Sequence, residues 1–124
     1  MTTQEYDYEG YVIRYNVEQP DGRIVCKDAF RTCGDVQVPL VYNVYKDGGV
    51  PDTSMENVLG TAYLENREDG VYARCIFYNT PIGLELKNNV EKYIKGITAF
   101  AIIVEYTAKE VRRGLIRAVK VISK

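Results

Sequence analysis

The segment VLGTAYLENREDGVYARCIFY, residues 58–78, decides the fold class. Residues 58–64 and 71–78 are strand-like runs, rich in β-branched and aromatic side chains. The polar residues between them end in Asp69 and Gly70, and an Asp-Gly pair is typical of a hairpin turn because glycine reaches positive φ without steric cost. The sequence therefore predicts a β-hairpin near the middle of the chain.

Further strand-like segments lie on both sides of this hairpin. Five runs have the alternation or the β-branched content of strands: residues 8–17, 24–26, 38–45, 97–106 and 115–122. Pro39 must lie at a strand start or on an edge, because proline has no N–H to donate to a ladder. We expect turns at residues 20–22 and 112–114, and one turn of helix at residues 28–31.

One helix is predicted near residues 81–95. Thr80 and Pro81 fit the N-cap and first helical positions, and Gly96 fits the residue that follows the C-terminus. Four apolar residues fall on one helical face: Leu86, Val90, Tyr93 and Ile94. About seven strands and a single helix predict a mostly β (α+β) fold, a closed or nearly closed antiparallel β-barrel, because closure removes exposed strand edges.

Length and composition indicate one domain over residues 1–124. Within it, residues 46–57 are rich in turn formers and have no periodicity, so we expect an exposed loop. Two interpretations of this loop stay open, a flexible insertion and a contact surface.

The charge pattern argues against two classes of partner. Sixteen basic and seventeen acidic residues are interspersed and give a formal net charge of −1, so we expect no binding to nucleic acid or to an anionic membrane. No apolar run approaches the roughly 20 residues that span a bilayer, and the first eight residues lack the features of a signal peptide. We therefore expect the protein to stay in the cytoplasm where it is made.

The sequence contains no histidine, which removes the usual general base of hydrolases and the commonest metal ligand. Its three cysteines, Cys26, Cys33 and Cys75, have no C-x-x-C spacing. We interpret them as reduced structural residues, with a reactive thiol as the alternative. No cofactor and no metal site are predicted.

Six segments in order carry a resemblance that covers nearly the whole chain. They are Tyr8-Glu-Gly-Tyr, Asp28-Ala-Phe, Val38-Pro-Leu-Val-Tyr-Asn43, the stretch 58–73, Thr80-Pro-x-Gly83 and Gly114-x-Ile-Arg-x-Val119. In these segments the chain resembles the prohead (capsid maturation) serine proteases of tailed phages, whose fold is similar to that of herpesvirus assemblin. The resemblance implies a protease-like barrel.

The catalytic positions implied by the resemblance are degenerate. The family's histidine, nucleophilic serine and acidic residue correspond to Val44, Thr98 and Ala118. Val44 and Ala118 are readily explained by packing, and Thr98 by a β-branched strand residue. A hydroxyl without a base to accept its proton cannot run triad chemistry.

We therefore expect a non-catalytic, prohead-protease-like protein of a phage or prophage head module. It would bind capsid or scaffold protein in the host cytoplasm and be incorporated in the prohead or virion. One alternative is a peptidase in which Lys95 serves Thr98, and another is a barrel recruited to an unrelated partner. Lys109, Glu105 and Glu110 are interpreted as surface charges.

The tyrosine content favours self-association or docking. Eleven tyrosines in a chain without tryptophan exceed what one core of this size needs. Tyrosine is enriched at interfaces because its ring is apolar and its hydroxyl is polar. We expect a homo-oligomer or a docked subunit of a larger assembly.

Overall fold

The computed structural model describes residues 6–20, 22–31, 36–42, 45–46, 50–51 and 57–123. Its elements in chain order are β1 (Tyr8–Arg14), β2 (Ile24–Val25), β3 (Gln37–Val41), β4 (Tyr45–Lys46), β5 (Val50–Pro51), β6 (Val58–Arg67), β7 (Gly70–Phe77), α1 (Pro81–Asn88), α2 (Val90–Tyr93), β8 (Ile94–Tyr106) and β9 (Glu110–Ser123). Most of the predicted loop at residues 46–57, together with Val44 and Cys33, lies outside the described residues.

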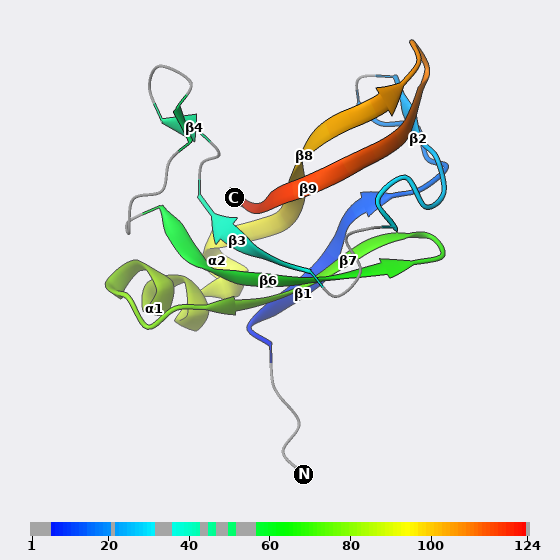
Figure 1. The fold of residues 1–124 in the computed structure, drawn as a ribbon. Helices are drawn as coiled ribbons and strands as arrows, with labels where there is room; N and C mark the ends of the chain where they lie inside the picture. The colour runs from blue at the N-terminus through cyan, green and yellow to red at the C-terminus, as the bar shows by residue number, and fades with distance from the viewer. Residues whose placement is uncertain are drawn as a thin grey trace.

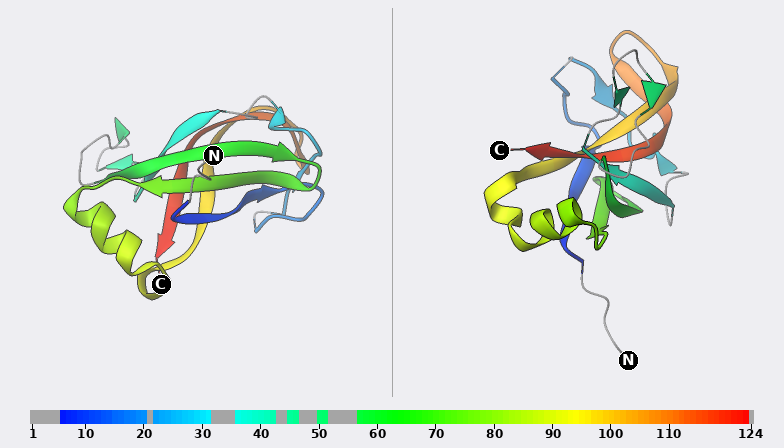
Figure 2. Two further views of the ribbon diagram at one scale, coloured as in Figure 1. Left: turned by 90° about the horizontal axis from the view of Figure 1, so that it is seen from below. Right: turned by 90° about the vertical axis from the view of Figure 1, so that its left-hand side faces the viewer.

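The predicted barrel is confirmed. One curved sheet runs in the order β1-β7-β6-β3-β9-β2, β8 pairs with the other edge of β9, and β8 comes back beside β1. Two layers result: Figure 1 shows β8 and β9 above β6 and β7, and the left view of Figure 2 shows them crossing behind β6, β7 and β1. In the part of the chain that the structure describes, no ladder joins β1 to β8, so the barrel stays open along the seam between these two strands.

Two pairings of β9 are parallel, which the sequence did not predict. Leu40 and Val41 of β3 pair with Val119 and Lys120, and the short β2 pairs with the start of β9. Pro39 is in the middle of β3, but the ladder with β9 begins only at Leu40. On that side Pro39 behaves as an edge residue, as expected from its missing N–H.

The central hairpin forms as predicted, with a different role for its glycine. β6 and β7 pair from Gly60 opposite Phe77 to Arg67 opposite Gly70, so the loop consists of Glu68 and Asp69. A Cβ at Gly70 would lie 2.2 Å from the carbonyl oxygen of Ile13 in β1. Gly70 is therefore needed because β1 approaches closely, in addition to its place beside the turn.

The turn of the second hairpin was predicted at the wrong place. Residues 112–114 lie inside β9, and the chain reverses at residues 107–109. The Thr107 hydroxyl oxygen accepts hydrogen bonds from the backbone N–H groups of Lys109 (3.3 Å) and Glu110 (3.0 Å). This side-chain turn reverses the chain without glycine. Gly114 instead faces Ile103 in the ladder.

The predicted helix is present in two pieces. Thr80 caps α1 as expected, since its hydroxyl oxygen accepts a hydrogen bond from the N–H of Gly83 at 3.1 Å. Asn89, at φ −136° and ψ 37°, separates α1 from α2, which ends at Tyr93. Gly96 belongs to β8 and does not end the helix, so the prediction of one helix over residues 81–95 was too long.

Near the N-terminus, one predicted strand is shorter than expected and one predicted helical turn is replaced, and a residue with positive φ lies at each place. Asn16 has φ 60°, and β1 ends at Arg14 instead of reaching residue 17. Asp28 has φ 61°, and residues 28–31 form successive turns, with Ala29 N–H bonded to the Cys26 carbonyl and Arg31 N–H to the Asp28 carbonyl. The predicted helical turn at this position is therefore a pair of tighter turns.

The core fills the inside of the barrel with side chains from almost every strand. The largest fully buried side chains are Phe30, Leu40, Leu59, Val71, Val119 and Cys75. Cys75 is a buried free thiol, in line with its structural interpretation, whereas Cys26 is partly buried and donates a hydrogen bond to Glu110 at 3.2 Å. The core is thus apolar where β6, β7 and β9 meet.

A substitution at Gly60 tests the close packing of β6 against β7. A Cβ at this position would lie 2.0 Å from the Ile76 carbonyl oxygen, so the backbone must move to admit alanine. We predict that Gly60→Ala lowers the free energy of unfolding in urea by at least about 2 kcal/mol. Gly10→Ala in β1 is the matched control, because nothing lies within 4 Å of its Cβ position. Equal stability of the two variants would contradict this packing.

The buried Cys75 thiol makes the free energy of unfolding depend on pH in the alkaline range. Burial is the main cause that raises the pKa of its thiol from 9.0 to about 12, with Asp7 and Glu9 adding to the shift. Above pH 9 the unfolded chain loses this proton while the folded chain keeps it, so the free energy of unfolding falls by up to ~1.4 kcal/mol per pH unit. We predict that the free energy of unfolding, measured in urea, falls less steeply between pH 9 and 11 in the Cys75→Ala variant than in the unchanged protein. Parallel curves would contradict the burial of the thiol.

Candidate functional site

The seam between β1 and β8 opens into a cleft of about 480 Å³. Val12 and Ile13 line it from β1, and residues 98–101 with Ile103 line it from β8. Its remaining walls include the core residues Val25, Phe30 and Val111 and the polar residues Gln19 and Arg23. This volume is within the range of about 300–1,000 Å³ that is common for ligand sites.

Thr98 and Ala118 come together on adjacent strands. In the β8–β9 ladder Thr98 is opposite Lys120, and Phe100 is opposite Ala118. Because side chains alternate along a strand, these four residues share one face, and Ile97, Ala99, Val119 and Val121 point into the core. Thr98 and Ala118 are therefore diagonal neighbours, a relation in which long side chains can touch. Val44 lies outside the described residues.

The side chains at these two positions provide little for catalysis. Ala118 is 8% exposed and has no functional group, and Thr98 is partly buried beside the cleft. Thr98 lies at the wall of the cleft, while its side chain shares the face of Phe100 and Lys120, opposite to the side chains that point into the core. Nucleophilic attack by the Thr98 hydroxyl would need a base to remove its proton.

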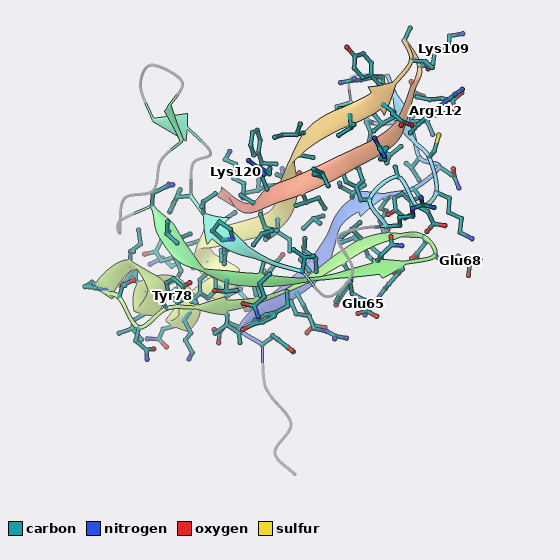
Figure 3. The ribbon with its side chains drawn as sticks, viewed as in Figure 1. Glu65, Glu68, Tyr78, Lys109, Arg112 and Lys120 are labelled. Atoms are coloured by element: carbon teal, nitrogen blue, oxygen red, sulfur yellow. The ribbon has the colours of Figure 1, made fainter. Side chains whose placement is uncertain are left out.

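The charged residues considered for Thr98 are distant from it along the chain. Lys95 has no partner in the β8–β9 ladder, because the register shifts between Ile94 and Gly96. It lies three positions before Thr98, which is about 10 Å along an extended strand. Glu105 is ion-paired with Arg113 at 3.3 Å near the other end of β8. Lys109 lies at the tip of the hairpin, as Figure 3 shows. The structure does not bring these groups to Thr98.

Lys120 is the residue at this site that the sequence analysis missed. It faces Thr98 directly across the ladder, and Figure 3 shows it toward the base of the hairpin. The Lys120 side chain is partly buried. The alternation of residues 115–122 put Ala118 and Lys120 on one face, and this signal could have identified the pair.

A second surface feature gathers tyrosine and arginine on the outer side of β1, β6 and β7. The Arg14 guanidinium carbon is 4.2 Å from the centre of the Tyr11 ring, and that of Arg67 is 3.8 Å from the Tyr72 ring. The Tyr11 and Tyr72 rings meet edge to face, with centres 5.1 Å apart. Together with Arg74 these residues form the Tyr–Arg cluster, whose composition is that of interface hot spots.

Carboxylates balance the charge of the Tyr–Arg cluster. Tyr11 donates a hydrogen bond to Asp69 and Tyr72 donates one to Glu9, each at 2.7 Å. The bond to Glu9 raises the pKa of Tyr72, because the neutral phenol is the donor. Glu65 lies 3.1 Å from Arg67 and 3.7 Å from Arg74. The cluster therefore has no field of one sign for a polyanion.

The described part of the chain was compared with the requirements of a metal cluster and of a membrane-spanning helix. Within it, no three His, Cys, Asp or Glu side chains gather in a way that could hold a metal ion. The described helices are also too short to cross a bilayer.

Comparisons with known proteins give no relative of this chain. No protein-family model matches it, and neither the curated proteins nor the solved structures contain a significant match.

Two substitutions test the environments at the candidate site. We predict that Thr98→Val changes the free energy of unfolding by less than about 0.5 kcal/mol, since the strand position accepts any β-branched residue. Ala118→Glu should cost about 1–3 kcal/mol, because it forces a carboxylate into a buried position. Urea denaturation measures both variants. A neutral Ala118→Glu would mean that the position is open to solvent.

Proposed function

We propose that this protein is a non-catalytic, prohead-protease-like barrel that binds a capsid or scaffold protein in a phage or prophage head module. The observation that supports the proposal is the β8–β9 ladder. It makes Thr98, a residue of the cleft wall, a diagonal neighbour of Ala118, and these are the two residues that the resemblance relates to the nucleophile and the acid. The resemblance itself supplies the phage setting.

Three features favour binding over catalysis. The chain has no histidine, so no imidazole can take a proton from Thr98. Ala118 has no carboxylate to orient a base. The cleft nevertheless has apolar walls and an open strand edge on each side, and open edges accept extended peptides through main-chain hydrogen bonds.

The Tyr–Arg cluster supports a role in an assembly. Tyrosine and arginine supply much of the binding energy at protein interfaces, since their large side chains combine apolar area with hydrogen bonding. In this proposal the cluster is a contact surface for the head protein or for a second copy of the chain. A cytoplasmic site of action and incorporation into the prohead belong to the same proposal.

An active peptidase is the second candidate, and the position of Lys120 is the observation that favours it. Lys120 is opposite Thr98, so a Thr–Lys pair would need no histidine. This candidate requires Lys120 to be neutral at the working pH. It also requires Thr98 and Lys120 to be indispensable for cleavage.

Incubation with purified capsid and scaffold proteins of the proposed head module separates the candidates. We predict co-sedimentation with at least one of them, with no new fragment by mass spectrometry over a day at neutral pH. Thr98→Ala should leave both results unchanged, because the hydroxyl performs no chemistry.

The control variant is Lys120→Met, which keeps the length of the side chain and removes the ammonium. Cleavage that disappears in both Thr98→Ala and Lys120→Met would establish the peptidase and refute the proposal. No binding to either head protein would instead favour a barrel recruited to an unrelated partner.

A further inference from the structure

The β8–β9 hairpin exposes an unusual number of apolar side chains. Ten large apolar side chains of the described residues are exposed, and five of them are on this hairpin. Ile102 and Leu115 face each other across the ladder and are 44% and 43% exposed. Toward the tip, Val104 is 44% exposed. These three residues, Ile102, Val104 and Leu115, are called the hairpin patch. Tyr106 is 65% exposed, but it is opposite the core residue Val111 and therefore lies on the other face of the hairpin.

The same hairpin holds a positive charge in a chain that is slightly acidic. Residues 94–123 contain six lysines and arginines and two glutamates, a net charge of +4, whereas the whole chain has a net charge of −1. The remainder of the chain is therefore clearly acidic. Because charges of both signs are interspersed elsewhere, the hairpin is a local exception to the balanced composition.

Ion pairs use only part of this positive charge. Arg113 lies 3.3 Å from Glu105, and Arg112 lies 3.8 Å from Glu110, so both glutamates have a cationic neighbour. Among the described residues no ion-pair partner is recorded for Lys109, Arg117 or Lys120. Figure 3 shows Lys109 at the tip and Lys120 toward the base, so cations border the patch at both ends.

The hairpin stays uncovered because it extends beyond the rest of the sheet. Figure 1 shows β8 and β9 projecting past β3 and β6. The short β2 pairs with the start of β9, and Phe30 packs against Gly114 on the core face, so the exposed face of the hairpin is the outer one with Ile102 and Leu115. Apolar area left in water forgoes roughly 25 cal/mol per Å² of stabilisation. Grouped apolar side chains with a polar border are the usual composition of a protein contact site.

We propose that the hairpin patch and its flanking cations, Lys109, Arg117 and Lys120, form a docking surface for an acidic segment of a partner protein that also carries apolar side chains. The apolar side chains of the segment cover Ile102 and Leu115 and supply most of the affinity. Its carboxylates meet the cations at the border, which raises the association rate and selects acidic partners.

The chemistry of the patch favours a protein over a nucleic acid. Single-stranded nucleic acids bind through rings on which bases stack, and branched aliphatic side chains offer no such surface. Glu105 also lies next to the patch and would repel a polyanion, whereas a segment with separated carboxylates can avoid it. The inference rests on the hairpin alone and does not depend on the resemblance to prohead proteases.

The test begins with the full chain immobilised and a library of random 16-residue peptides. We expect enriched sequences to combine aspartate or glutamate with aliphatic or aromatic residues. A synthetic copy of an enriched peptide should bind in fluorescence anisotropy, and its affinity should weaken at least tenfold when salt rises from 50 to 300 mM. Leu115→Gln and Arg117→Glu should each weaken binding about tenfold or more.

Matched controls separate the patch from general surface effects. Leu84→Gln changes an apolar residue of α1 that is 41% exposed, and Lys92→Glu reverses an exposed charge on α2; both should leave peptide affinity within twofold. Circular dichroism and urea unfolding verify that all variants fold.

Four outcomes would overturn the inference. The enriched peptides could lack acidic residues, or the control variants could lose as much binding as the patch variants. The chain could bind 20-nucleotide single-stranded DNA or phosphatidylserine vesicles but no peptide, or it could form a dimer in light scattering that Leu115→Gln dissociates while no peptide binds. The absence of any enriched peptide would overturn it as well. A head protein that binds the chain through another surface would leave the proposed function intact and refute this inference alone.

Discussion

Strand β9 holds the barrel together because both of its edges are paired. One edge forms the long antiparallel ladder with β8, and the other forms short parallel ladders with β3 and β2. β9 is therefore the only connection by hydrogen-bonded ladders between β8 and the sheet of β3, β6, β7 and β1 among the described residues. The β3–β9 contact at Leu40 and Val119 therefore joins the β8–β9 hairpin to the rest of the sheet.

The features relevant to function follow from the alternation along β9. Residues that point inward, such as Val119 and Val121, fill the core. Ala118 and Lys120 point to the face that Thr98 shares, and Leu115 lies across from Ile102 nearer the tip. The register skips Arg117 between the pairs of Ala118 and Ile116, so a bulge separates the candidate site from the hairpin patch. One strand thus positions two surfaces of different chemistry.

Local signals in the sequence predicted the local structure well. The hairpin of β6 and β7 and the Thr80 cap depend on neighbouring residues, and both are present. Gly114 misled the turn prediction, because a glycine beside two arginines resembles a turn. In the structure the Phe30 ring packs against Gly114, and a Cβ at position 114 would lie 2.5 Å from a carbon of that ring. That contact joins residues far apart in the chain, and no local pattern reveals it.

The candidate site was predictable only in part for the same reason. Matching segments pointed to Thr98 and Ala118, and the ladder makes them neighbours. The cleft depends on which strands face each other at the seam, and the parallel pairings of β9 depend on contacts between distant segments. Lys120 was within reach of sequence reasoning, because it is two positions after Ala118 in an alternating strand. The Tyr–Arg cluster was not, since it gathers residues from three strands.

In the proposed function, Thr98 is not an activated nucleophile. Treatment of the folded protein with a fluorophosphonate, which reacts covalently with activated hydroxyls, followed by peptide mass spectrometry, measures this property at the residue itself. The account predicts no adduct on Thr98 under conditions that fully label an active serine hydrolase. A stoichiometric adduct on Thr98 that is lost when the protein is unfolded before treatment would contradict it.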